Sequence, residues 1–110
     1  KKFYSYSEKI PPFFTNEAIA FLISQDIEHL VVDLPSLDKT NDEGKLGNHR
    51  IFWGGDNIPN CKINVNSTRT ITEFAYISNQ IKDGFYFLNI ALPNFQCDAA
   101  PSRPLILKPT

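Results

Sequence analysis

One segment of the chain places apolar side chains at the spacing of a helix. In residues 15–26 the apolar positions recur every three to four residues, and Thr15 or Asn16 can accept a hydrogen bond from the first turn. The pattern therefore predicts a helix over 15–26. The apolar stripe expected to be buried consists of Ala18, Phe21 and Leu22.

Other apolar runs are rich in β-branched and aromatic residues, which is typical of strands. Residues 27–34 follow the helix directly and end before Pro35, so we expect a buried strand, parallel to its neighbours. Further strands are predicted within 1–10, 69–77, 85–92 and 105–108. The expected fold class is α/β (mixed α+β), in which one main helix packs on a mixed sheet formed by 27–34, 69–77 and 85–92.

Between these runs, residues 39–67 form a polar stretch rich in Asn, Asp, Gly and Lys, interrupted by the apolar residues 51–53. We expect a long polar loop region without regular structure for most of its length. Loops of this length are uncommon in compact domains and are often functional. With 110 residues, the chain fits a single domain, or a fragment of a larger one.

Charge and composition disfavour several classes of protein. Eleven Lys and Arg against twelve Asp and Glu give a net charge of −1, so no basic field favours nucleic acid or an anionic membrane. The longest uncharged apolar stretch, residues 18–24, is far shorter than the roughly 20 residues that cross a bilayer. Cys61 and Cys97 form neither a disulfide framework nor a paired zinc motif, which favours a reduced, cytoplasmic location.

His49 and Glu73 are the first candidates for chemistry. His49 precedes Arg50 in the polar stretch, where an imidazole can bind a metal, shuttle a proton or simply face solvent. Glu73 is a carboxylate inside a strand-like run. It either lies on the solvent face of an edge strand or is buried, in which case it needs a cation or several hydrogen-bond donors.

Asp33 and Asp38 flank the turn that follows the predicted strand 27–34. The carboxyl ends of strands in open α/β sheets are where binding sites form, although Asp beside Pro also serves ordinary turn chemistry. The second histidine, His29, lies near the start of that strand. The phosphate-loop, dinucleotide, serine-elbow and HExxH motifs do not occur in the sequence.

The order of five short motifs resembles the C-terminal half of the cyclase family of metal-dependent hydrolases, which includes bacterial kynurenine formamidases and isatin hydrolases. The motifs are 32-VDLPSLD-38, 48-NHRIFWG-54, 71-ITEF-74, 82-KDGFYFLNIALP-93 and 98-DAAPSRPLIL-107. The resemblance runs from about residue 11 to residue 107. It implies a swivelling β/β/α domain and a divalent metal, zinc or manganese, that activates water against a small amide or lactone.

In that family the His of the His-Arg stretch and the Glu of the next strand are metal ligands, and the resemblance carries these roles to His49 and Glu73. The family signature H-x-G-T-H-x-D-x-P-x-H, which supplies the other ligands and the acid/base His, does not occur in the 110 residues. His49 and Glu73 are also 24 positions apart, more than is usual in the family, and residues 55–70 occupy the excess. We therefore expect a C-terminal portion of such a hydrolase that cannot catalyse alone.

An incomplete domain leaves apolar surface exposed, so we also expect a homo-oligomer. The competing hypothesis is a non-catalytic module of the same fold that serves protein interaction or oligomerisation. In that case Phe52 and Trp53 of the long loop would form an apolar docking surface.

Overall fold

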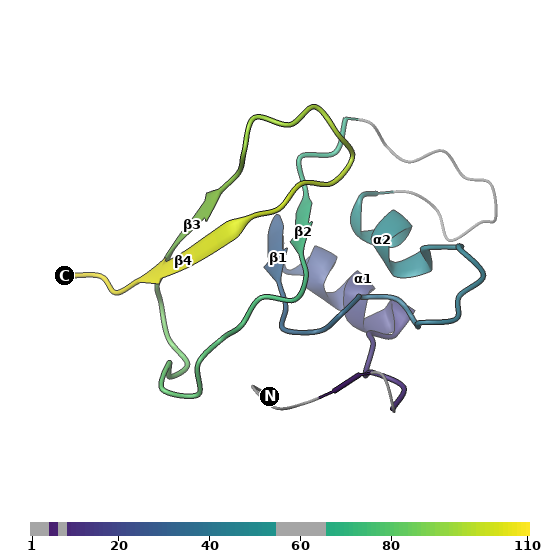
Figure 1. The fold of residues 1–110 in the computed structure, drawn as a ribbon, viewed down its shortest axis with the longest axis horizontal. Coiled ribbons are helices and arrows are strands. Elements are labelled where there is room, and N and C mark those ends of the chain that lie inside the picture. The colour runs from purple at the N-terminus through teal and green to yellow at the C-terminus, as the bar shows by residue number, and fades with distance from the viewer. Residues whose placement is uncertain (1–4, 7–8, 55–65) are drawn as a thin grey trace. The chain divides into compact units, whose positions relative to one another are not determined.

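A computed structural model describes residues 5–6, 9–54 and 66–110. The chain divides into two compact units, Lys1–Tyr76 and Ile77–Thr110. The first unit contains α1, β1, α2 and β2, and the second contains β3 and β4 (Figure 1). Helices together with two small sheets confirm the mixed α+β class.

Helix α1, Asn16–Ser24, confirms the predicted helix and its cap. The Thr15 hydroxyl accepts a hydrogen bond from the Ala18 N–H at 3.2 Å, as an N-cap side chain should. The predicted buried stripe is wrong at Phe21, whose side chain is 63% exposed. The helix instead buries Ile19 and packs Leu22 and Ile23 against the core, because a stripe shifted by one position satisfies the same helical spacing.

Strands β1, His29–Val31, and β2, Thr70–Thr72, pair in parallel, with Leu30 opposite Ile71. This confirms the parallel pairing expected for the run after the helix, but the expectation of a buried strand is wrong, because the three residues of β1 are exposed or half-buried. The core of the first unit contains the buried side chains of Ile19, Val32, Leu37 and Phe52.

Helix α2, Gly47–Phe52, lies within the stretch predicted as a polar loop. Its N-cap residue, Leu46, has a left-handed backbone (φ 48°) and no capping side chain, so the sequence next to the helix carries no start signal. The fully buried Phe52 anchors the helix in the core and is therefore not part of a docking surface, contrary to the alternative stated above. Residues 55–70 account for the unusually long separation of His49 and Glu73, and most of them, residues 55–65, lie outside the described residues.

In the second unit, β3, Phe87–Ala91, and β4, Arg103–Leu107, pair antiparallel, with Asn89 opposite Leu105. Within the described part of the chain, the strands thus form two two-stranded sheets where the sequence predicted one mixed sheet. Of the strand predicted within 1–10, residues 5, 6, 9 and 10 are not in a strand, and the other residues lie outside the described part.

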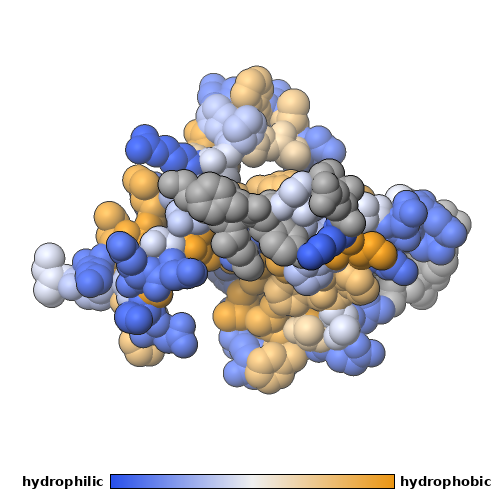
Figure 2. Space-filling view, turned by 60° about the horizontal axis from the view of Figure 1, so that its bottom comes forward, coloured by the Kyte–Doolittle hydropathy of each residue, from blue (hydrophilic) through white to orange (hydrophobic). Residues whose placement is uncertain are grey.

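Several large apolar side chains reach the surface, where apolar residues appear in orange in Figure 2. Within the described ranges, no helix combines the length and the apolar character needed to span a bilayer.

Candidate functional site

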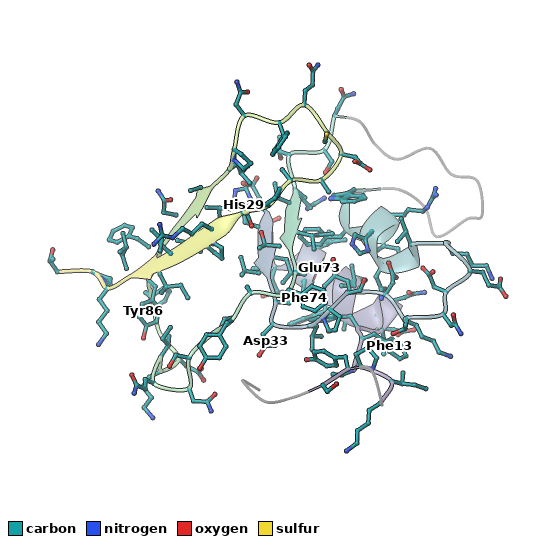
Figure 3. The ribbon with its side chains drawn as sticks, in the orientation of Figure 1. Phe13, His29, Asp33, Glu73, Phe74 and Tyr86 are labelled. Atoms are coloured by element: carbon teal, nitrogen blue, oxygen red, sulfur yellow. The ribbon has the colours of Figure 1, made fainter. Side chains whose placement is uncertain are left out.

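The first unit brings together Asp38, His49 and Glu73, which are far apart in the sequence. Asp38 ends the turn after β1, and His49 lies in α2. Glu73, which is labelled in Figure 3, directly follows β2. Their side chains are only 8%, 12% and 26% exposed. The two candidates His49 and Glu73 therefore share one half-buried site, and Asp38 joins them.

Asp38 holds the imidazole of His49 from one side. Its Oδ2 lies 2.6 Å from His49 Nδ1, and its Oδ1 accepts a hydrogen bond from the Asn48 N–H at 2.7 Å. The same carboxylate lies 3.5 Å from the backbone N of His49. Asp38 thus satisfies the orphan N–H groups of the first turn of α2, as an N-cap would, from ten residues upstream.

Glu73 faces the other ring nitrogen of His49. Its Oε1 lies 3.3 Å from His49 Nε2 and accepts a hydrogen bond from the Leu37 N–H at 2.8 Å. These donors provide what a partly buried carboxylate requires. Glu73 is therefore not a solvent-facing side chain of an edge strand, because it is 26% exposed and accepts a hydrogen bond from the backbone N–H of Leu37.

Asn48 fixes α2 to the segments that carry the site. Its side-chain amide is buried, and Nδ2 donates to the carbonyl oxygens of Phe14 at 2.8 Å and Leu37 at 2.9 Å. The Phe14 N–H in turn donates to the Leu37 carbonyl at 3.0 Å. The turn that presents Leu37 to Glu73 is therefore held by buried hydrogen bonds.

Trp53 borders the site on the helix side. Its ring meets the imidazole of His49 edge-on, with ring centroids 5.3 Å apart. Because the Trp ring covers one side of the imidazole, it contributes to the burial of His49. The fluorescence of Trp53 should therefore respond to changes at His49.

The two carboxylates govern the charge of His49. Burial by itself lowers the pKa of His49, but the hydrogen bonds and charges of Asp38 and Glu73 outweigh it and raise the pKa to about 9. Burial likewise opposes ionisation of both carboxyl groups. Nevertheless, hydrogen bonds from His49, from the Asn48 N–H to Asp38 and from the Leu37 N–H to Glu73 hold the pKa of each carboxyl below its usual value. Near neutral pH the free site is an imidazolium between two carboxylates.

The same arrangement fits a metal ligand pair. Nε2 of His49 and Oε1 of Glu73 are 3.3 Å apart. Two donors about 2.0–2.2 Å from a tetrahedral zinc ion are separated by about 3.3–3.6 Å. Asp38 contacts the other ring nitrogen, Nδ1. Metal-bound histidines commonly donate this second N–H to a carboxylate, which fixes the tautomer and the ring orientation.

No group of three or more His, Cys, Asp or Glu side chains in residues 5–6, 9–54 and 66–110 is arranged to hold a metal ion. Asp38 is bound at the far side of the imidazole, so it cannot share an ion with Nε2. Protein zinc sites usually have three or four protein ligands. A complete site around His49 and Glu73 therefore needs ligands from elsewhere.

The remaining candidates lie apart from this pair. His29 is in β1, where it is exposed and its Nδ1 lies 2.9 Å from the Thr70 hydroxyl. Asp33 is half-buried in the turn after β1 (Figure 3). For Asp38 the sequence left open both a binding-site role and ordinary turn chemistry. Its contact with His49 depends on helix α2, and the sequence next to that helix gives no helix-start signal.

Searches against protein-family models, curated proteins and solved structures found no match for this chain.

Proposed function

We propose that the chain is the C-terminal portion of a metal-dependent hydrolase that acts on a small aryl or cyclic amide, of the arylformamidase or cyclase type. His49 and Glu73 supply part of the ligand set for a divalent ion, zinc or manganese. The remaining ligands and the acid/base histidine come from residues outside these 110. The isolated chain is then inactive and binds the metal weakly, since two protein ligands seldom hold zinc.

One observation carries this proposal. His49 Nε2 and Glu73 Oε1 face each other at 3.3 Å, while Asp38 fixes the opposite ring nitrogen at 2.6 Å. Such an oriented histidine next to a carboxylate is the donor chemistry that suits zinc or manganese. The motif order noted in the sequence points to the same two residues.

The chain's own groups have distinct roles in this proposal. Asp38 keeps the proton on Nδ1, so that Nε2 presents its lone pair once it loses its own proton. The Leu37 N–H orients Glu73 through Oε1. When bound, a divalent ion supplies Lewis-acid chemistry and lowers the pKa of its water towards neutrality, which favours attack on an amide carbonyl.

The test uses the natural protein that contains this chain. We expect His49→Ala to abolish both stoichiometric metal content and turnover of an aryl formamide, because a direct ligand is lost. His29→Ala is the matched control, since His29 is exposed and lies in β1 of the same unit. Equal effects of the two substitutions, or an intact protein without metal, would contradict the proposal.

The hairpin of the second unit supports a second candidate, an interaction or oligomerisation module of the same fold. Both faces of the β3–β4 pair carry exposed apolar side chains, namely Phe87, Leu105 and Leu107 on one face and Leu88 and Ile106 on the other. A two-stranded hairpin is only marginally stable by itself, so such side chains favour burial against another surface.

We propose that the protein resides in the cytoplasm, as its cysteine usage favours. We also propose that this hairpin contributes to a homo-oligomer. Sedimentation velocity should show at least a dimer. Leu88→Lys should shift the protein towards monomer, whereas Gln80→Lys, which places the same charge at an exposed polar position outside β3 and β4 of the same unit, should leave the assembly unchanged. A monomeric natural protein would contradict the oligomer.

A further inference from the structure

The parallel ladder between β1 and β2 contains one extra residue just after β2. The ladder is regular where the Thr70 N–H donates to Glu28 and the Val32 N–H donates to Thr72, both at 2.9 Å. A regular parallel strand would continue with the N–H of residue 74 donating to the Val32 carbonyl. Instead the Ala75 N–H makes that bond, at 2.9 Å. Glu73 and Phe74 therefore form a β-bulge, the kind of irregularity that re-aims side chains next to functional sites.

Phe74 has an unusual backbone conformation at this bulge. Its φ is 56°, in the left-handed region, which bulky side chains rarely adopt. Burial of the ring does not account for the conformation, because the Phe74 side chain is 69% exposed. Strained backbone of this kind persists where the surroundings hold it, and it is concentrated at functional sites.

The bulge attaches Glu73 to the turn that completes the site. The Phe74 N–H donates to the Leu34 carbonyl at 2.9 Å, so the peptide that joins Glu73 to Phe74 is held against the turn after β1. From this position the Glu73 carboxylate reaches the Leu37 N–H of the same turn and faces His49. Glu73 and Phe74 are adjacent in Figure 3, at the end of β2.

We propose that Phe74 is a positioning residue: its left-handed backbone holds the bulge that places the Glu73 carboxylate between the Leu37 N–H and His49. The positioning itself follows from the backbone geometry. Its consequence for metal binding rests on the proposed function, in which Glu73 is a ligand.

A graded series of substitutions at position 74 tests the backbone role. Asn tolerates a left-handed conformation, Ala less so, and the β-branched Val least. Tyr76→Val is the matched control, because Tyr76 is an aromatic residue, 68% exposed, two positions beyond the bulge. The first readout is hydrogen exchange of the Leu37 amide in the metal-free chain, which reports on its hydrogen bond to Glu73. The second is Co²⁺ affinity in the natural protein.

We expect Phe74→Asn and Tyr76→Val to preserve both readouts. Phe74→Val should accelerate Leu37 exchange and weaken Co²⁺ binding by about 10-fold or more, the range typical for loss of groups that orient ligands. Phe74→Ala should lie between Asn and Val, and it replaces Val in the comparison if the Val variant does not fold.

Unchanged Leu37 exchange in both the Val and the Ala variants would overturn the proposal. Loss of protection in the Asn variant would overturn it as well, because the ring rather than the backbone would then be responsible. Accelerated exchange in the Val variant with unchanged Co²⁺ affinity would support the positioning role and contradict Glu73 as a metal ligand, so the two proposals fail separately.

Discussion

The pairing of His49 with two carboxylates makes the stability of the metal-free first unit depend on pH above neutrality. The pKa of His49 is raised from 6.5 to about 9 in the folded chain. A raised pKa means that the folded state binds the proton more tightly than the unfolded state. The resulting stabilisation is fully present below about pH 6.5 and is lost as the pH rises through about 9.

The size of this effect follows from the two pKa values. One pKa unit corresponds to about 1.4 kcal/mol, so the shift of His49 contributes about 3 kcal/mol to the free energy of unfolding near pH 6. Roughly half of this contribution is lost by pH 8, and nearly all of it by pH 10. For a small domain whose total stability is about 5–15 kcal/mol, such a loss is readily measured.

Urea denaturation of the metal-free chain, measured in the presence of a chelator at pH 6, 7, 8 and 9, tests this expectation. Trp53 is the only tryptophan of the chain and lies against the His49 ring, so its fluorescence reports on the site. His49→Gln should flatten the profile, whereas His29→Gln should leave its slope over this range unchanged. A wild-type profile that is already flat, or a slope that survives His49→Gln, would refute the reasoning.

Two further predictions concern stability near pH 6. Asp38→Asn should reduce the free energy of unfolding by about 2 kcal/mol, because the carboxylate accepts hydrogen bonds from His49 and from the first turn of α2. The control Glu28→Gln, at an exposed carboxylate of the same unit, should change the free energy of unfolding by less than about 0.5 kcal/mol. Equal losses in the same urea titrations would contradict the capping role of Asp38. Ile19→Ala should lower the free energy of unfolding by about 2–5 kcal/mol and Phe21→Ala by much less, since Ile19 is fully buried and Phe21 is largely exposed. A larger loss for Phe21→Ala than for Ile19→Ala in thermal unfolding would contradict the observed buried face of α1.

The sequence predicts elements best where local signals suffice. Thr15 caps α1 through its own hydroxyl, and the β-branched run after the helix forms a strand parallel to β2. The buried face of α1 could not be predicted, because Phe21 and Ile19 belong to stripes that fit the same period, and only the shape of the core selects between them.

Long-range contacts explain what the sequence did not show at the site. Helix α2 lacks a local capping side chain and depends on Asp38, ten residues upstream, for the hydrogen bonds of its first turn. Without α2, neither the placement of His49 on a helix nor its contact with Asp38 can be anticipated. The bulge at Phe74 is equally hidden, because Phe is not a residue type that signals a left-handed backbone.

We propose that His49 and Glu73 bind one divalent ion in the natural protein. Anomalous X-ray diffraction from crystals of that protein, recorded on both sides of the zinc absorption edge after growth with zinc, tests it most directly. We expect an anomalous peak about 2.0–2.2 Å from both His49 Nε2 and Glu73 Oε1, with Asp38 still bound to His49 Nδ1. A protein that takes up no zinc at this place, or a peak coordinated by His29 or other residues instead, would contradict it.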